Sequence, residues 1–344
     1  MPWSGRAVRA QESIALRSDI LLYGDNTEFR NPFREGETLF GAGARVFADL
    51  SLGSSAVVSL GVFGNQRFGS ERAFEQVRPV IALTVRGRRS TFVFGTFPAP
   101  TPEGPIGPDR GGPHRLLPPL QRETLAFERA YEPGLLWRFA GDRLTHSMWI
   151  EWQRLNTAEH RERFDGGVEG SVSLTRAVAI PFQLHVVHEG GQQFASGPVR
   201  DSTAAAVGIE LTHGAAETAR MSLELYGAAS RSVPDRERPI DGRNGRAVFA
   251  RAAVERGGWR AHLVVWRGRE FIKDEGDPNY SALRRDGHRY GGTRDYAETG
   301  LARRFRIAPG AAIEVSGRVH RTERFYEYSY RVIAITSFRI ARDK

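Results

Sequence analysis

The sequence predicts an all-β protein, a closed antiparallel transmembrane β-barrel of about sixteen strands, within a range of roughly 14 to 18. The leading observation is the alternation of apolar and polar residues. Along residues 311–320, Ala, Ile, Val, Gly and Val share one face, while Ala, Glu, Ser, Arg and His share the other. Side chains alternate across a strand, so one face is apolar and the other is hydrated. Apolar faces that all point outward indicate a barrel in lipid with a polar interior.

Composition supports the same class. The chain of 344 residues contains no run of about 18 apolar residues, so no transmembrane helix is predicted. Its hydrophobic content of 40% and mean hydropathy of −0.41 are low for a helical membrane protein. There is no cysteine, which excludes disulfides, zinc knuckles and a thiol nucleophile.

The first eight strands follow from alternation bounded by turns. Residues 14–23 place Ile14 and Leu16 on one face and Arg17 on the other. Residues 77–86 alternate equally well, although Pro79 removes a ladder donor. Tight turns at residues 53–55 and 141–143 separate neighbouring strands. The expected strands are 14–23, 39–52, 57–68, 77–86, 91–97, a sixth ending with 134–139, 144–154 and 168–175.

The remaining eight strands are predicted in the same way. Residues 205–211 and 221–225 place aliphatic side chains at every second position. Glycine-containing turns at residues 256–258 and 308–310 join two further pairs of strands. The expected strands are 182–189, one containing 205–211, one containing 221–225, 248–255, 259–266, 296–307, one beginning at 311 and 326–340.

The connections alternate in length. They are short after even-numbered strands and mostly long and polar after odd-numbered ones, as in barrels with short periplasmic turns and longer outside loops. Outside loops are therefore expected near residues 24–36, 69–76, 98–121, 155–167, 190–202, 230–246 and 269–293, with both termini in the periplasm. The barrel is expected to span residues 13–344. Residues 1–12 are expected to be a tail left from a signal-peptide cleavage region, with small residues Val8 and Ala10 before Gln11.

The last strand places aromatic and apolar residues at alternate positions from Tyr326 to Ile340, followed by residues 341–344. It resembles the closing strand of bacterial outer-membrane proteins, and the whole chain resembles a porin-type barrel in pattern and topology. The resemblance implies an outer-membrane location, with membrane lipid, lipopolysaccharide and the barrel assembly machinery as partners. It also implies a third outside loop folded into the lumen, here residues 98–120. The expected constriction residues are Glu103, Asp109, Arg110, His114 and Arg115.

The net charge of +9 does not indicate nucleic-acid binding, because arginines alternate with acids, as in residues 159–163 and 235–238. On the inward face, arginines gather on the first and last strands and acids on the seventh to eleventh. Opposed charged walls would create a transverse field across a pore. Alternatively, these charges pair and hold the wall together. The residues expected to line the pore and select solutes by charge are Arg17, Arg45, Arg78, Arg86, Arg138, Glu151, Glu210, Glu224, Arg251, Arg318 and Arg331.

Local motifs for chemistry are absent from the sequence. His185 and His188 would point to opposite faces of a strand, so they cannot bind one metal ion. No catalytic residue, metal or cofactor is assigned, and no G-x-S-x-G elbow is present. The expected function is a non-enzymatic outer-membrane channel for passive diffusion of small polar or charged solutes. The alternative is an outer-membrane barrel enzyme, in which scattered Ser, His and Asp converge as in barrel lipases and proteases, or a surface-binding scaffold. A soluble all-β protein is a third interpretation, and the oligomeric state stays open.

Overall fold

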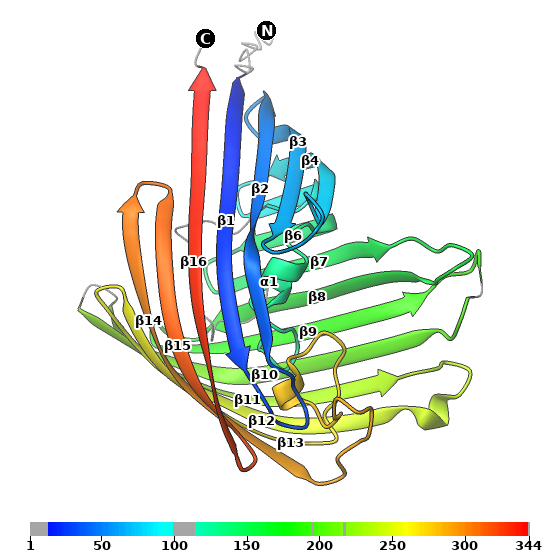
Figure 1. The fold of residues 1–344 in the computed structure, drawn as a ribbon. Helices are drawn as coiled ribbons and strands as arrows, with labels where there is room; N and C mark the ends of the chain where they lie inside the picture. Colours follow the sequence, from blue (N-terminus) through cyan, green and yellow to red (C-terminus); the bar gives the residue numbers. More distant parts are fainter. Residues whose placement is uncertain (1–12, 99–113, 195, 216–217, 343–344) are drawn as a thin grey trace, which may run out of the picture.

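The computed structural model describes residues 13–98, 114–194, 196–215 and 218–342. These residues form sixteen antiparallel strands, each paired with its neighbours in sequence, and β1 pairs with β16 to close the barrel (Figure 1). The predicted fold class and strand number are confirmed. The strands are β1 (Ile14–Glu28), β2 (Glu37–Leu52), β3 (Ala56–Arg67), β4 (Gln76–Arg86), β5 (Ser90–Thr96), β6 (Pro133–Ala140), β7 (Leu144–Arg154), β8 (Glu162–Ser173), β9 (Val178–Gly190), β10 (Arg200–Ala215), β11 (Ala219–Val233), β12 (Arg243–Arg256), β13 (Trp259–Arg269), β14 (Thr293–Ala308), β15 (Ala311–Thr322) and β16 (Phe325–Arg342).

Helices are few and short in the described chain. They are α1 (Leu125–Glu128) and the 3₁₀ turns η1 (Pro239–Asp241) and η2 (Pro278–Tyr280). None of these helices is long and apolar enough to cross a membrane.

Alternation decides which side chains face outward. Along β13, Leu263 and Val265 are about half exposed, whereas the intervening His262 and Val264 are buried in the interior. The same two-residue period runs through β11 and β15, where Leu223 and Val315 point outward. Because these exposed side chains are apolar, the outer surface suits contact with lipid.

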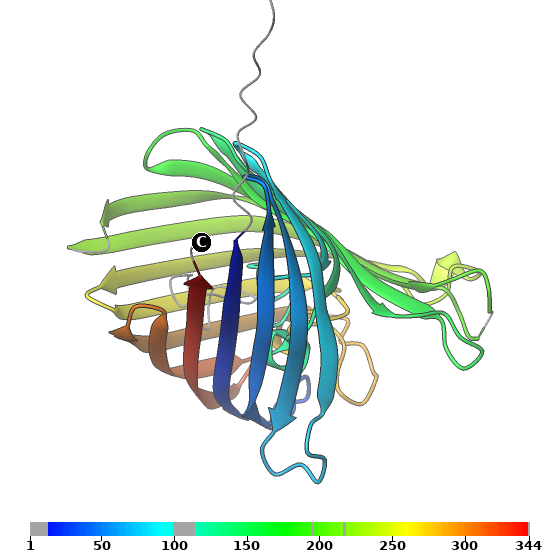
Figure 2. The ribbon, with the colours of Figure 1, turned by 90° about the horizontal axis from the view of Figure 1, so that it is seen from above.

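The two ends of the barrel differ. Short turns such as those joining β12 to β13 and β14 to β15 lie at the end where both termini emerge, which we call the terminal end (Figure 1). Gly257 and Gly258 both have positive φ in the first of these turns, a conformation that glycine adopts without steric cost. The longer connections after β1, β5 and β13 lie at the opposite end, which we call the loop end. Figure 2 shows β1 beside β16, so the seam of the barrel joins the first and last strands.

The wall is lower at β5 and β6, which contain seven and eight residues. β5 pairs with β4 only along Ala82–Arg86, so the rest of β4 lacks a paired strand on that side among the described residues. The hydroxyl of Tyr131 donates to the carbonyl of Pro79 there, at 2.8 Å. Pro79 therefore lies in an edge segment, where a proline is tolerated.

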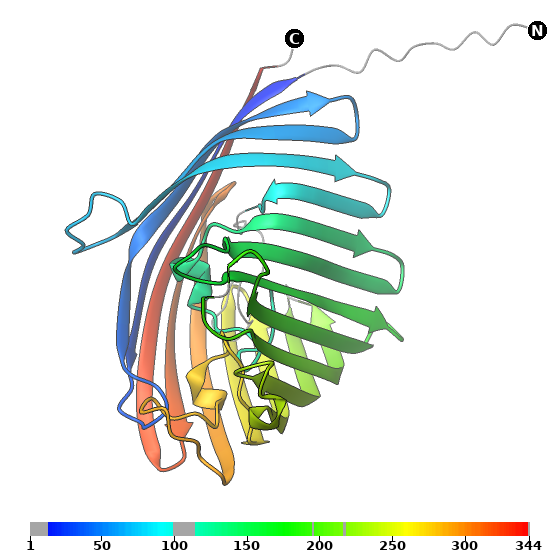
Figure 3. The ribbon, with the colours of Figure 1, turned by 90° about the vertical axis from the view of Figure 1, so that its right-hand side faces the viewer.

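Two connections fold into the lumen (Figure 3). They are residues 114–132, which we call the inner segment, and residues 270–292, which we call the inner loop. Leu116, Leu117 and Leu120 of the inner segment are almost fully buried against inward side chains of the wall such as Trp149 and Trp266. The lumen at this level therefore contains a packed apolar core.

Candidate active site

Three neighbouring strands place a serine, a histidine and a glutamate together on the inner wall. The register sets Glu298 of β14 opposite His320 of β15, and His320 opposite Glu327 of β16, two residues from Ser329. Ser329, His320 and Glu298 all point inward and are each at most 5% exposed. Sequence reasoning missed this convergence, although the inward periodicity includes all three positions.

The distances match those of a serine nucleophile with its base. Ser329 Oγ lies 2.8 Å from His320 Nε2. On the other side of the ring, His320 Nδ1 lies 2.7 Å from the hydroxyl of Tyr296 and 3.3 Å from Glu298 Oε2. A nucleophile, a base and a group that orients the base are the recurring parts of acyl-transfer sites.

The hydrogen-bond donors indicate the working tautomer of the histidine. The Tyr296 hydroxyl donates to Glu298 Oε2 at 2.7 Å, so its oxygen is free to accept a hydrogen bond from His320 Nδ1–H. Nδ1 then carries the ring proton, and Nε2 accepts from the Ser329 hydroxyl. This is the arrangement in which histidine acts as a general base toward serine.

Neighbouring groups fix the glutamate and exclude water. His262 Nε2 lies 2.9 Å from Glu298 Oε1, and Arg318 Nη1 lies 3.7 Å from Glu298 Oε2. The Phe29 ring packs edge-on against His320, with centroids 4.9 Å apart, and Tyr280 of the inner loop packs on Tyr296 at 4.6 Å. The site is thus enclosed by the segment after β1 and by the inner loop.

A second cluster joins the inner loop to the opposite wall. Glu275 accepts from Arg129 of the inner segment at 2.7 Å and from Arg163 of β8 at 2.9 Å. Burial alone would raise the pKa of Glu275, but these two arginines and His185 hold it well below its usual range. Burial lowers the pKa of the adjacent Lys273 to about 8 despite the nearby acids. The cluster therefore anchors the inner loop by ion pairing.

The same cluster has ligand types that suit a metal ion. Ligand atoms of Asp165, His185 and Glu275 all lie within 4.8 Å of one another. However, Arg129 Nη2 lies 2.7 Å from Glu275 Oε2 and 3.9 Å from Asp165 Oδ2, so a guanidinium already supplies positive charge between the carboxylates. Adding a divalent cation beside Arg129, Arg163 and Lys273 would be electrostatically unfavourable, and we do not assign a metal here.

The predicted pore-lining residues occupy inward positions, and most form polar contacts. Glu224 and Arg251 pair at 2.6 Å, Arg17 and Asp49 at 3.5 Å, and Glu210 and Arg220 at 4.0 Å. A further group is held by the inner segment or its ends: Arg318 and Arg331 pair with Glu123, Glu151 lies 4.0 Å from Arg129, and Arg45 donates to the carbonyls of Phe97 and Ala130. Arg78, Arg86 and Arg138 are exposed. A role of these residues in charge selection stays a prediction.

The predicted constriction residues are only partly described. His114 is buried in the lumen and stacks on Trp149 with ring centroids 3.8 Å apart, whereas Arg115 is exposed. Glu103, Asp109 and Arg110 lie outside the described residues. Among the residues that tie this region to the wall is Glu123, which pairs with Arg318 and Arg331 and for which the sequence contains no local signal.

Solved structures with a similar fold are outer-membrane proteins. A loop L8 deletion mutant of OmpT, an outer-membrane protein of Vibrio cholerae, matches with a TM-score of 0.57 and 9% identity, covering 95% of this chain and 100% of that chain. OccK8 (OprE) of Pseudomonas aeruginosa matches with a TM-score of 0.53 and 11% identity, covering 95% and 98%. OpdL of the same organism gives 0.52 and 12%, covering 95% and 99%. Identities this low show the barrel fold alone.

Comparison with curated proteins gives no match. Residues 7–341 match a family model described as lipid A 3′-O-deacylase-type. This match overturns the expectation that the protein is not an enzyme, because the family is named for a deacylase. The sequence offered no local motif for such an activity, since its candidate residues come from separate strands. The chain belongs to the lipid A 3′-O-deacylase-type family of bacterial outer-membrane β-barrels.

Proposed function

We propose that this protein is an outer-membrane ester hydrolase that removes an acyl chain from lipid A. The observation that carries the proposal is the contact of 2.8 Å between Ser329 Oγ and His320 Nε2, with Glu298 and Tyr296 on the far side of the ring. The family match supports the same reaction class and suggests lipid A as the substrate.

The proposed reaction has two steps. Ser329 Oγ attacks the ester carbonyl carbon, and its proton passes to His320 Nε2. The C–O bond to the sugar breaks, and the leaving sugar oxygen takes that proton, which leaves an acyl group on Ser329. Water then attacks the acyl carbon and gives one proton to His320. The bond between Ser329 Oγ and the acyl carbon breaks, the fatty acid leaves, and His320 returns the proton to Oγ. Glu298 and Tyr296 orient the imidazole and stabilise its protonated form.

The position of the site suits a lipid in the outer leaflet. Ser329 lies near the start of β16 and Glu298 near the start of β14, both toward the loop end. With the longer connections outside, this end lies at the level of the outer leaflet. The segment after β1 and the inner loop cover the serine, so a lipid reaches it only when these segments move.

The passive channel predicted from the sequence receives less support. The likeness to outer-membrane barrels concerns the fold, while the family match concerns a deacylase. The inner segment also contacts opposite parts of the wall, through Gln183 of β9 and Arg331 of β16. A diffusion channel would need a path around these contacts.

Mass spectrometry of lipid A incubated with purified protein in detergent micelles tests the proposal. Wild-type protein should release a fatty acid, and Ser329→Ala and His320→Gln should each reduce the rate by roughly 10³-fold or more. Ser316→Ala is the matched control, because this serine is buried on the inner face of β15 and makes no side-chain hydrogen bond to a histidine in the described chain. A fluorophosphonate probe should label the wild type and Ser316→Ala but not Ser329→Ala. Full fatty-acid release by Ser329→Ala would refute the assigned nucleophile.

A further inference from the structure

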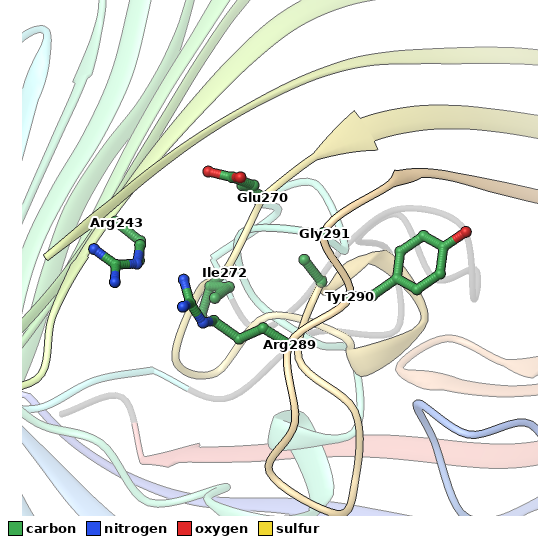
Figure 4. A pocket seen from close by; sticks show the side chains of 7 residues that line it. Arg243, Glu270, Ile272, Arg289, Tyr290 and Gly291 are labelled. Atoms are coloured by element: carbon green, nitrogen blue, oxygen red, sulfur yellow. The ribbon is translucent and has the colours of Figure 1, made fainter. Parts of the chain in front are cut away.

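A cavity at the loop end lies between β12 and the inner loop, away from the serine. It has a volume of about 180 Å³ and is lined by Arg243, Glu270, Ile272, Ala282, Arg289, Tyr290 and Gly291. This volume is several times the roughly 30 Å³ that one water molecule occupies in the liquid. Figure 4 shows the side chain of Arg289 extending from the inner loop toward that of Arg243. The cavity therefore presents two guanidinium groups from separate elements.

Neither arginine has an acidic partner within ion-pair distance in the described chain. Arg243 Nη1 donates to the carbonyls of Ile240 and Gly242, at 3.1 and 3.0 Å, which holds the guanidinium in place and leaves its other N–H groups available. A third cation, Arg284, lies over the ring of Tyr290, 5.6 Å from its centroid. Arg289 is exposed, and neither its guanidinium nor that of Arg243 is paired with a carboxylate in the described chain, although Glu270 lines the same cavity. Two such arginines at one cavity favour an anion, and their forked N–H groups match phosphate oxygens.

The remaining charged residue that lines the cavity, Glu270, is an acid. Glu270 also lacks an ion pair in the described chain, so its carboxylate is available to accept hydrogen bonds. Sugar hydroxyls supply such donors. A ligand that carries a phosphate beside free hydroxyls would satisfy all three side chains.

The cavity and the proposed active site share one loop. Ala282 lines the cavity, and Tyr280, two residues earlier, packs on Tyr296 beside His320. On the cavity side, Tyr290 packs edge-on against Phe33, with ring centroids 6.0 Å apart. A ligand bound through its phosphate in the cavity would therefore lie next to the elements that cover Ser329.

We propose that the cavity between Arg243, Arg289 and Glu270 binds the phosphate of a phosphorylated sugar, which is the headgroup chemistry of the lipid substrate. This inference rests on the proposed function for the identity of the lipid. The binding site itself rests on the two unpaired arginines.

The test measures binding of lipid A to the purified protein in detergent micelles. One sample keeps its phosphates, and the other is treated with a phosphatase. Wild-type protein should bind the phosphorylated form at least about tenfold more tightly, because two charge-assisted contacts are lost with the phosphate. The double variant Arg243→Gln/Arg289→Gln should bind both forms equally. Arg285→Gln is the matched control, since Arg285 lies on the same loop, is exposed and pairs with Glu35 at 3.5 Å. It should keep the preference.

Two further measurements separate the sources of the phosphate and the two proposals. Inorganic phosphate should compete with phosphorylated lipid A only weakly and only when both arginines are present; binding of phosphate alone as tightly as the lipid would refute the headgroup assignment. Labelling of Ser329 by the fluorophosphonate probe should be unchanged in the double variant. Equal binding of the two lipid A forms by wild-type protein would overturn the phosphate site, whatever the result at Ser329.

Discussion

Replacing Glu123 with glutamine should release the inner segment from the wall. Glu123 is 8% exposed, and its Oε1 lies 2.7 Å from Arg318 Nη1 while Oε2 contacts Arg331 Nη1. These are the acid–base contacts that tie this segment to the last two strands. Glutamine keeps the shape but removes the charge, so both arginines lose an ionised partner.

The size of the expected loss in the free energy of unfolding depends on the acidic partners that Arg318 and Arg331 keep. Removing one partner from a buried ion pair typically costs about 3–5 kcal/mol. Arg331 keeps Asp25, with contacts of 2.9 and 3.1 Å, and Arg318 keeps Glu298 at 3.7 Å. We therefore expect a loss of about 2–3 kcal/mol in the free energy of unfolding, below the full range.

Urea unfolding in lipid vesicles, followed by tryptophan fluorescence, measures this loss. Single-channel recording of the same samples should show a higher conductance for Glu123→Gln, because an untethered segment leaves the lumen more often. Glu128→Gln is the control: its carboxylate pairs with Arg122 within the same segment and does not join it to the wall. If Glu123→Gln unfolds like Glu128→Gln and conducts like the wild type, the inner segment is held by its apolar contacts, and the reasoning is wrong.

Three other predictions concern the wall and the inner loop. Arg at outward Leu223 should cost about 2–4 kcal/mol if this position is near mid-membrane, and Arg at the adjacent inward Ser222 much less; equal costs in urea unfolding would contradict the assignment of faces. Lys273→Met should stabilise the protein by up to about 3 kcal/mol below pH 8, because the folded-state pKa of about 8 lies below the usual 10.5 and folding penalises the protonated lysine. This gain in the free energy of unfolding should vanish by about pH 10.5. A gain that does not change between pH 7.5 and 10.5 would refute the prediction. Glu275→Gln should destabilise the folded protein at pH 7. Because the folded-state pKa of Glu275 is lowered, the difference in free energy of unfolding between variant and wild type should shrink as the pH falls below about 4.5. A difference that stays constant between pH 7 and 3 would count against the ion pairs.

The barrel could be predicted from the sequence because alternation and turns are local signals. Inward positions such as Glu298, Arg318 and Arg331 follow from the period of two along a strand. The meeting of Ser329 with His320 depends in addition on the register between strands. That register is set by tight hairpins, and the turn between Thr322 and Phe325 fixes it for β15 and β16. Counting from this turn pairs His320 with Glu327 and makes Ser329, two residues further along, its diagonal neighbour on the same face.

The contents of the lumen were harder to predict. A loop has no fixed period, so the pairing of Glu123 with Arg318 and Arg331 depends on how residues distant in sequence pack. One signal was present: Leu116, Leu117 and Leu120 form an apolar group in an otherwise polar connection, and all three are buried against the wall. The cavity of the inner loop had no comparable signal, because Arg243 and Arg289 come from different elements.

The contacts of the inner segment have a consequence for how this barrel assembles. The segment lies about a third of the way along the chain, yet Phe127 stacks on Tyr23 of the first strand at 4.8 Å, and Glu123 pairs with Arg331 of the last. These two strands meet only at the seam, along fifteen paired positions from Ile14 to Glu28. The segment can complete its packing only when the last strand joins the first. Pairing of β1 with β16 and packing of the inner segment in the lumen are therefore coupled in one cooperative step. A folding intermediate that lacks the β1–β16 pairing would also lack the packed inner segment.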